Sequence, residues 1–373
     1  MDGLVCQTCG AIYDLDEPRW RCDCGGVLDV EFTPTLNIAR IAGRAPTLWR
    51  YREAIPIRNE ASIVSFNEGF TPLVELQLGA RSVLIKQDNL FPSGSFKDRG
   101  ATVLISKAKE AGIARVVEDS SGNAGCAVAA YCARAGIDCE IFVPADTAQA
   151  KLAQIQLYGA TLRRVPGSRE DTARAAWAAA ERTYYASHVW NPFFFQGTKT
   201  FAYEVWEQLG WKAPDTVVVP VGHGTLLLGA YIGFRDLLRT GHIRRLPRLV
   251  GVQAAASAPL YEAFVQGSDD ALPITKRPTI AEGIAIAEPV RGRQILRAVR
   301  ETGGLILAVD EAEVEQALLM TCREGLYIEP TSAAAIAGLR RYLQQARPDE
   351  IIVSVLTGHG LKATEKLLHL TRH

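Results

Sequence analysis

The stretch RVVEDSSGNAGCAVAAYCARA, residues 115–135, shows most directly how the chain is built. Its first four residues form a short run around two valines, which indicates a strand, and a glycine-bearing turn follows at 120–125. An alanine-rich segment then predicts a helix over 124–135. In an open parallel sheet such a turn lies at the carboxyl edge, where ligands bind. The stretch therefore predicts an α/β fold with a binding turn at 120–125.

The same alternation of short apolar runs and helical patterns continues from about residue 73 towards the carboxyl end. It indicates βαβ units around a parallel sheet. We predict further strands at 83–86, 139–144, 216–221, 248–252 and 351–356, and further helices at 101–112, 148–158 and 173–182.

Composition limits the classes of function. The 373 residues suffice for two packed domains, and 48% hydrophobic with 22% charged residues is ordinary for a globular protein. Lys plus Arg and Asp plus Glu number 41 each, so no global field attracts nucleic acid or anionic membrane. Residues 1–6 lack signal-peptide features, and no apolar run approaches the ~18 residues of a membrane span. We expect a cytoplasmic protein that binds neither nucleic acid nor membrane.

Four of the eight cysteines lie in the first 24 residues, in the runs CQTCG at 6–10 and CDCGG at 22–26. Paired cysteines followed by glycines are typical of a zinc ribbon, in which glycine lets the backbone turn around the metal. The second pair has one intervening residue where two is commoner, and reduced thiols without metal are the alternative. With four protein ligands the ion would be structural. The predicted Zn²⁺ ligands are Cys6, Cys9, Cys22 and Cys24.

Two more glycine turns follow predicted strands, GHGT at 222–225 and LTGHGLK at 356–362, and a lysine lies in the run PSGSFKDRG at 92–100. The turn at 222–225 enters a helix and is the better phosphate cradle. Each turn alone is a weak signal, because such turns are common for structural reasons. Together with the lysine they form a constellation. It is neither a Walker A loop nor a dinucleotide-binding fingerprint.

These motifs carry a family resemblance. SFKDRG at 95–100, SSGN at 120–123 and TGHGLK at 357–362 resemble threonine synthase, a pyridoxal 5'-phosphate (PLP) enzyme with the tryptophan synthase β-subunit fold. The amino-terminal ribbon resembles that of many long threonine synthases. Further matching motifs are NPF at 191–193, GTKT at 197–200 and AEGIA at 281–285.

The resemblance implies PLP fold type II, with two open parallel-sheet α/β domains, the cofactor in the cleft between them and a small amino-terminal zinc ribbon. It places the ribbon at 1–30, a large PLP-binding domain at 31–95 plus 190–373, and a small domain at 96–189. It also implies a small amino-acid substrate and a homodimer.

The resemblance further implies a role for each motif. Lys97 would hold PLP as a Schiff base and later move protons at the substrate carbons; a solvated surface lysine is the alternative. Asn123 would bond the ring hydroxyl oxygen, although it could instead cap a helix. Thr357 would face the pyridine nitrogen, and a neutral partner there suits elimination and replacement better than transamination. The substrate carboxylate would be held by Ser120, Ser121, Gly122, Asn123 and Ala124.

The phosphate of PLP would be held by backbone N–H groups and one hydroxyl in the turn at Gly222, His223, Gly224, Thr225 and Leu226. In the run EPTSA at 329–333, Thr331 and Ser332 are second candidates near the pyridine ring. For His359 we favour a packing role, with the ring tied to a neighbouring carbonyl.

Two positions depart from the family pattern. Phe194 stands where threonine synthases often carry an arginine that grips the substrate phosphate, and a phenylalanine cannot pair with a dianion. His223 stands where many relatives have a small or amide residue. It could donate to a phosphate and replace that cation, or it could be a packing residue in a pocket that serves another leaving group.

Three hypotheses follow. The first is threonine synthase, which converts O-phosphohomoserine and water to threonine and phosphate by γ-elimination and β-addition. The second is another PLP β-replacement or β-elimination lyase acting on a serine- or threonine-type amino acid, free or phosphorylated: a cysteate, cysteine or diaminopropionate synthase, or a threonine deaminase. The third is a catalytically dead binding module, against which the retention of Lys97 and Asn123 argues.

Overall fold

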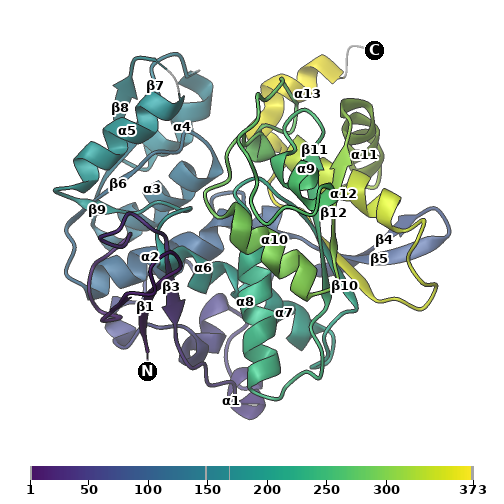
Figure 1. Ribbon diagram of the computed structural model, residues 1–373, viewed down its shortest axis with the longest axis horizontal. Coiled ribbons are helices and arrows are strands. Elements are labelled where there is room, and N and C mark those ends of the chain that lie inside the picture. Colours follow the sequence, from purple (N-terminus) through teal and green to yellow (C-terminus); the bar gives the residue numbers. More distant parts are fainter. Residues whose placement is uncertain (1, 148, 168, 371–373) are drawn as a thin grey trace. The chain divides into compact units, whose positions relative to one another are not determined.

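Three β-sheets organise the part of the chain that the computed structural model describes, residues 2–147, 149–167 and 169–370 (Figure 1). The chain divides into two compact units. One is formed by Met1–Gly69 and Lys97–Thr200, and the other by Phe70–Phe96 and Phe201–His373. Each unit is therefore assembled from segments that are distant in the sequence.

The first unit contains two of the sheets. The ribbon forms a three-stranded antiparallel sheet in the order β2-β1-β3, and a four-stranded parallel sheet has the order β8-β7-β6-β9. The elements are β1 (Gly3–Cys6), β2 (Ile12–Tyr13), β3 (Leu28–Glu31), α1 (Ile38–Ala42), η1 (Leu48–Ala54), η2 (Glu60–Ser62), α2 (Lys97–Glu110), β6 (Arg115–Glu118), α3 (Asn123–Ala135), β7 (Asp138–Pro144), α4 (Gln149–Leu157), β8 (Thr161–Val165), α5 (Arg169–Ala180), β9 (Tyr184–Tyr185) and α6 (Pro192–Thr198).

One hydrophobic core joins the ribbon to the parallel sheet of this unit. Leu4 and Leu28 of the ribbon belong to the same buried cluster as Leu104 of α2 and Ala127 of α3. Small side chains let helix α3 pack closely on α2 and on β7, which explains its run of alanines. The ribbon is thus an integral part of the first unit.

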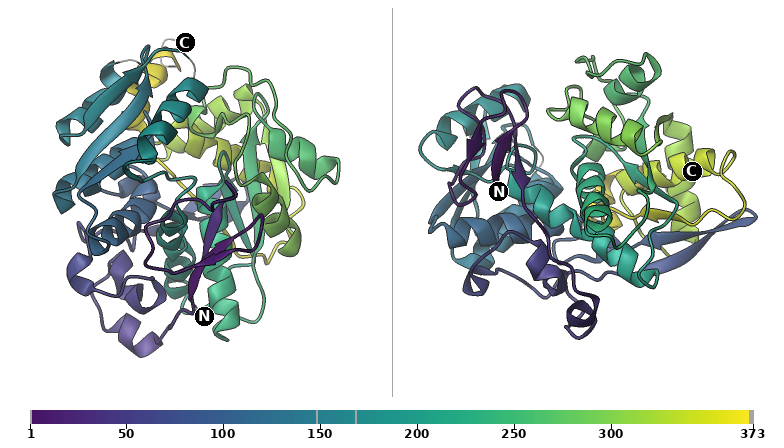
Figure 2. Two further views of the ribbon diagram at one scale, coloured as in Figure 1. Left: turned by 60° about the vertical axis from the view of Figure 1, so that its left-hand side comes forward. Right: turned by 60° about the horizontal axis from the view of Figure 1, so that its bottom comes forward.

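The second unit is built around a six-stranded sheet in the order β12-β11-β10-β13-β5-β4. All neighbours are parallel except the edge strand β4, which forms an antiparallel hairpin with β5 that projects at one side of this sheet (Figure 2). The elements are β4 (Leu73–Leu78), β5 (Arg81–Lys86), η3 (Asp88–Leu90), α7 (Thr200–Gln208), β10 (Thr216–Pro220), α8 (Thr225–Arg239), β11 (Arg248–Ala254), α9 (Pro259–Val265), η4 (Glu282–Ile284), α10 (Gly292–Glu301), β12 (Leu305–Val309), α11 (Glu311–Arg323), α12 (Pro330–Tyr342), β13 (Ile352–Val355), η5 (Gly360–Ala363) and α13 (Thr364–Leu370).

The order of the strands decides where this unit presents its turns. Strand β13 lies between β10 and β5, and the three run parallel. The segments that follow β10 and β13 therefore leave the sheet at the same carboxyl edge. Valine and isoleucine fill the buried strands, and α12 packs across β10 to β13. The fold thus brings residues 222–226 and 357 to one edge.

All six predicted strands are present, with ends that differ by at most two residues. Helix α2 begins at Lys97, four residues before the predicted start, and α5 runs from 169 to 180, where 173–182 was predicted. The predicted helix 148–158 is α4, and residue 148 lies outside the described residues. Strands β1, β2 and β3 of the ribbon and strands β4, β8, β9 and β12 were not predicted.

The structure groups residues 31–69 and 190–200 with the first unit, where the sequence-based boundaries placed them in the large domain. Buried contacts with α2 explain this. Leu48 and Trp49 pack against Val103, and the Trp49 indole donates to Thr102 Oγ1 over 3.1 Å. Helix α6 packs against the same helix.

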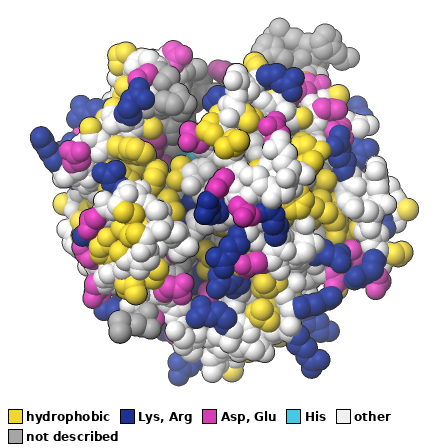
Figure 3. All heavy atoms as spheres, viewed as in Figure 1, with side chains coloured by type: hydrophobic (Ala, Val, Ile, Leu, Met, Phe, Trp, Pro, Cys, Tyr) yellow, Lys and Arg dark blue, Asp and Glu magenta, His cyan; other side chains and the backbone are white. Residues whose placement is uncertain are grey.

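Charges of both signs are interspersed on the face shown in Figure 3. On α10, for example, Arg293 pairs with Asp270, and Arg297 with Glu301. This mixture agrees with the balanced composition. Within the described ranges, none of the helices has both the length and the apolar character that a membrane span needs.

Candidate cofactor and substrate site

Lys97 is the first residue of α2, and an aromatic ring lies against it. Its Nζ is 5.7 Å from the centroid of the Phe194 ring in α6. Phe194 is fully buried, and a Cβ added to Gly100 would lie 2.3 Å from its Cε1. Lys97 is half-buried, and its role in holding the cofactor stays a prediction. The Phe194 ring therefore forms part of the surroundings of the Lys97 amine.

The predicted motifs at 95–100 and 197–200 meet where α6 packs on the start of α2. A Cβ on Gly197 would lie 1.9 Å from the carbonyl oxygen of Arg99, so only glycine fits. The buried Arg99 guanidinium donates to Thr200 Oγ1 over 3.1 Å, and that hydroxyl donates to the Gly197 carbonyl over 2.7 Å. Arg99 therefore orients the helix start, as a structural residue does.

The turn at 120–124 connects β6 to α3 in the same unit. Gly125 lies where a Cβ would be 1.9 Å from the Ser120 carbonyl oxygen, so the turn requires glycine there. Gly122 is the N-cap and Asn123 the first helical residue, so the alternative that Asn123 caps the helix is wrong. Ser120, Ser121 and Asn123 are half-buried. The N–H groups of the first helical turn have no partners within a helix and suit an anion.

In the second unit, the turn at 222–225 leads from β10 into α8. Gly224 is the N-cap with a φ of 73°, a left-handed conformation that favours glycine. A Cβ on Gly222 would lie 3.0 Å from Ile284 Cα, and one on Gly283 would lie 2.7 Å from Thr331 Oγ1. The motifs at 222–225, 281–285 and 329–333 therefore contact one another. His223 is half-buried, whereas Thr225 and Leu226 are buried.

Thr357, just after β13, is 1% exposed and held from three sides. Its hydroxyl donates to Glu329 Oε1 over 3.2 Å and lies 3.1 Å from Ser332 Oγ. Its N–H donates to Ser332 Oγ over 2.8 Å. Its carbonyl accepts from the N–H of Phe96 over 2.9 Å, which ties this strand end to the residue before Lys97.

Glu329 is a residue that the sequence analysis missed. In the run at 329–333 we singled out Thr331 and Ser332. The Glu329 carboxylate, however, accepts from the Thr357 hydroxyl and packs against Gly358. The Ser332 hydroxyl accepts from the backbone N–H of Thr357 and so positions that residue. The acidic residue before Pro330 was the available signal. The hydroxyl of Thr357 therefore has a carboxylate as its neighbour, a feature that the motif alone does not reveal.

His359 packs, as expected, but with a different partner. Its ring meets Tyr327 edge-on at 5.9 Å, and its Nδ1 accepts a hydrogen bond from the Leu361 N–H over 3.2 Å. The expected bond to a carbonyl is wrong, because the histidine caps the helix η5 and caps accept from N–H groups.

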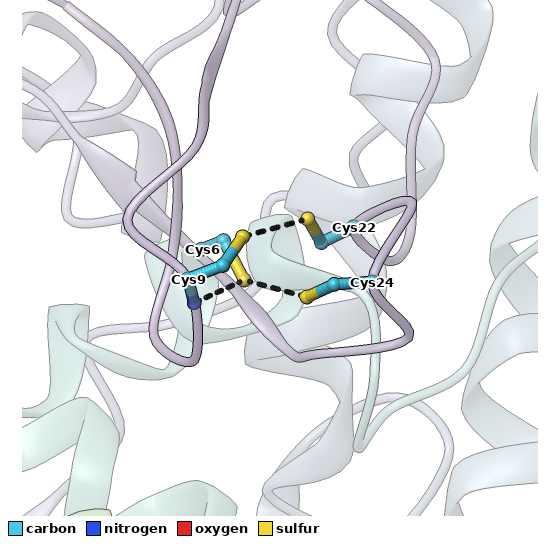
Figure 4. A group of neighbouring side chains, drawn as sticks. All are labelled: Cys6, Cys9, Cys22 and Cys24. Carbon is cyan, nitrogen blue, oxygen red and sulfur yellow. Dashed lines mark hydrogen bonds between the residues drawn. The ribbon is translucent and has the colours of Figure 1, made fainter.

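The four amino-terminal cysteines converge (Figure 4). All four Sγ atoms lie within 4.8 Å of one another, with 3.5 Å between Cys6 and Cys24 and 3.5 Å between Cys9 and Cys22. Tetrahedral thiolates around zinc are separated by roughly 3.8 Å, given Zn–S bonds of about 2.3 Å. The group is therefore compatible with one tetrahedral metal ion.

Comparison with known proteins identifies the family. Residues 64–358 match the family described as pyridoxal-phosphate dependent enzyme. The chain is 39% identical to the threonine synthase of Methanocaldococcus jannaschii, over 96% of this chain and 92% of that protein. It is 34% identical to that of Methanosarcina acetivorans, over 98% and 93%. The chain belongs to the threonine synthase family of PLP-dependent enzymes.

Solved structures confirm the fold class. The threonine deaminase of T.th. matches with a TM-score of 0.67 and 26% identity, over 78% of this chain and 92% of that chain. The serine racemase of Dictyostelium discoideum matches with a TM-score of 0.66 and 26% identity, over the same shares. The predicted PLP fold type II, an α/β fold with parallel sheets, is thus confirmed.

Proposed function

We propose that the chain is a threonine synthase, a lyase that converts O-phosphohomoserine and water to threonine and phosphate. The observation that carries this is its similarity to threonine synthases, at 34–39% identity over most of both chains. The motifs of that family lie in ordered turns at helix starts in both units.

The residues present suit PLP. Gly222 and Gly224 leave a turn without side-chain bulk, whose N–H groups and Thr225 hydroxyl would hold the phosphate. Lys97 would carry the cofactor through its amine, and the buried hydroxyl of Thr357 would meet the ring nitrogen. When bound, PLP supplies the electron sink that proton removal at the substrate carbons requires.

The chain's own groups divide the remaining work. The half-buried amine of Lys97, beside an aromatic ring, would take and return the protons at the substrate carbons. The turn at Ser120–Ala124 would bind the substrate carboxylate at the start of α3, and Asn123 would orient the ring oxygen. The dianion of O-phosphohomoserine has no partner in Phe194, because a phenyl ring carries neither a positive charge nor a hydrogen-bond donor.

Phe194 is also the observation that favours the second candidate. A site without a cation at this position suits an uncharged leaving group, as in a β-replacement or β-elimination enzyme acting on serine or threonine, threonine deaminase included.

One assay separates the candidates. The holoenzyme is incubated with O-phosphohomoserine, phosphoserine and threonine in turn, and released phosphate and the amino- or oxo-acid products are quantified. We expect equal amounts of threonine and phosphate from O-phosphohomoserine. Threonine absent at saturating O-phosphohomoserine, with an oxo-acid formed from threonine, would establish the second candidate instead.

Lys97→Ala tests the lysine. Borohydride fixes PLP to the lysine that carries it, so peptide mapping of the reduced protein should find the adduct on Lys97. In Lys97→Ala both the adduct and the turnover should be lost. An adduct on another lysine of the native protein would refute the assignment.

We also propose that Cys6, Cys9, Cys22 and Cys24 hold one structural Zn²⁺, supported by the spacing of their Sγ atoms. Metal analysis of protein purified without chelators should give about one zinc per chain. Cys9→Ser should lose it, and Cys322→Ser, which changes a cysteine outside this cluster, should retain it. Native protein without zinc would contradict the proposal. A cytoplasmic homodimer is also proposed, and it rests on the family resemblance.

A further inference from the structure

Trp20 anchors the ribbon to the parallel sheet of the first unit. It lies two residues before Cys22 and is 8% exposed. Its ring meets Tyr185 edge-on at 4.9 Å and Trp190 edge-on at 5.8 Å, and Trp177 lies 6.3 Å away. Aromatic pairs at these distances and angles attract one another beyond simple burial. The ribbon therefore inserts its tryptophan into an aromatic cluster of the domain.

Tyr185 connects the aromatic cluster to a buried carboxylate. It ends β9, next to β6, where it pairs with Val117. Its hydroxyl donates to Asp119 Oδ1 over 2.7 Å, and both residues are buried, at 1% and 5% exposure. Burial and the neighbouring carboxylate Asp119 raise the pKa of Tyr185 well above its ordinary value of 10, so it stays a proton donor.

Asp119 is the residue from which the turn at 120–124 departs. It follows the last residue of β6 directly, and Ser120 comes next. A side chain fixed at this point fixes where the backbone leaves the sheet. The position of Asp119 therefore determines where the hydroxyls and N–H groups of the turn point. A short buried hydrogen bond to a carboxylate is strong enough to do this.

The ribbon contacts α2 as well. Asp16 accepts from the Lys107 ammonium over 2.6 Å, and Lys107 is 3% exposed. Although burial raises the pKa of Asp16, Lys107 and Arg58 lower it below its ordinary value, so the carboxylate is charged at neutral pH. The ribbon therefore contacts both the helix that begins at Lys97 and the strand pair that precedes the turn.

We propose that Trp20 and Tyr185 are positioning residues for the substrate carboxylate, which act through Asp119 on the turn at 120–124. The ribbon then contributes to substrate binding as well as to the stability of the unit. This inference rests on the proposed role of that turn. Trp20 and Tyr185 act on the reaction through the turn and are not catalytic residues.

The test separates binding from catalysis and from folding. Tyr185→Phe removes only the hydroxyl, Trp20→Ala removes the ring, and Trp20→Phe retains part of it. We expect KM for O-phosphohomoserine to rise about 3- to 10-fold in the first two, with kcat nearly unchanged and an intermediate value for Trp20→Phe. Titration with L-threonine, followed by the visible absorbance of bound PLP, should show the same loss of affinity without turnover.

Tyr203→Phe is the matched control. Tyr203 is fully buried and donates to Asp236 Oδ2 over 2.6 Å, so it loses the same kind of bond in the second unit. We expect a similar loss of thermal stability with unchanged KM. An unchanged KM and L-threonine affinity in folded Tyr185→Phe would overturn the proposal, and so would an equal rise of KM in Tyr203→Phe. If Trp20→Ala does not fold, Tyr185→Phe and Trp20→Phe decide.

Ser121→Ala separates the positioning role from the carboxylate role of the turn. A weaker affinity in Ser121→Ala together with an unchanged affinity in Tyr185→Phe would refute the positioning role alone. An unchanged affinity in Ser121→Ala would refute only a role of that hydroxyl, because the N–H groups of the turn stay in place, and Tyr185→Phe then decides the positioning role. If the chain turns L-threonine over, as the second candidate would, the KM for L-threonine replaces the titrated affinity in both comparisons.

Discussion

Phe194 illustrates how a single residue can be read differently in sequence and in space. By the family resemblance, it occupies a position at which threonine synthases often carry an arginine for the substrate phosphate. In the structure its ring is fully buried, fills the space above Gly100 and lies against the Lys97 amine. A charged side chain placed there would be desolvated beside another cation. Where the family motif has a charged arginine, this chain therefore has an aromatic ring that packs against Gly100.

Gly100→Ala should destabilise the protein. The added Cβ would lie 2.3 Å from Phe194 Cε1, so the ring or the helix must move, and overpacking of this kind costs about 1–3 kcal/mol. Denaturant unfolding measures the loss. Phe194→Leu in the same chain should restore part of it. Gly43→Ala, at an exposed position with a φ of −78°, is the control and should change little. A Gly100→Ala protein as stable as the parent would contradict the observed packing.

At this scale, the motifs indicated which residues to examine but not their partners. The lysine, the asparagine and the four cysteines could be selected because chemistry and short spacing mark them. Glu329 and Tyr185 could not be assigned roles, because their partners Thr357 and Asp119 lie 28 and 66 positions away. Such pairs exist only once the strands have been ordered.

Among the elements, the segment that joins the ribbon to β4 is stabilised by an ion pair of its own. Arg44, just after α1, donates Nη1 to Glu53 Oε2 over 2.5 Å, and its Nη2 bonds Oε1, while Nη1 also donates to the Arg50 carbonyl over 2.8 Å. The two-pronged bond from Arg44 lowers the pKa of Glu53 from 4.5 to about 2. The carboxylate is therefore held in its charged form by the fold.

This shift predicts a pH dependence of stability. Because the folded pKa lies below the unfolded one, the contribution is fully present above pH 4.5 and is lost as pH falls from 4.5 towards 2. Glu53→Gln should therefore destabilise the protein by on the order of 1 kcal/mol at pH 7, and the difference should shrink on acidification. Thermal midpoints of both proteins between pH 7 and pH 3 measure this.

The exposed Glu324→Gln serves as the control for that series and should show no such trend. A difference between Glu53→Gln and the parent that stays constant down to pH 3 would show that the shifted carboxyl is not its source.

The elements themselves were predictable where their pattern was strong. Strand β10 is a nearly continuous buried apolar run, and β6 and β7 have buried apolar residues at their centres; all three were predicted within one residue. Strand β8, with the sequence TLRRV, is mostly exposed, and β9 has two residues, so neither carries a clear signal. The early start of α2 was missed because the sequence SGSFKDRG reads as a turn, whereas α6 packs against it and stabilises the helix.

For the whole molecule, the candidate cofactor residues belong to both units, and the chain passes between these units after Gly69, Phe96 and Thr200. A ligand that binds the folded chain and not the unfolded one stabilises it in proportion to RT ln(1 + [L]/Kd). PLP is expected to act in this way.

Removal of PLP should therefore lower the thermal midpoint. At a free concentration of 100 times Kd the stabilisation is about 2.7 kcal/mol, so stripping the cofactor with hydroxylamine and restoring it should move the midpoint down and back. In Lys97→Ala the shift should be smaller, because the covalent attachment is gone. Equal midpoints with and without PLP in the parent protein would contradict cofactor binding by the folded chain.

The position of β5 has a consequence for how the protein is made. Lys86 must pair with Val355, yet the ribosome adds only about 5–20 residues per second, so the partner emerges on the order of 15–50 s later. During that interval the growing polypeptide can complete the β4–β5 hairpin, but one side of β5 lacks its permanent neighbour. An open strand edge of this kind invites pairing with other chains. Nascent copies should therefore depend on chaperones until translation is nearly finished.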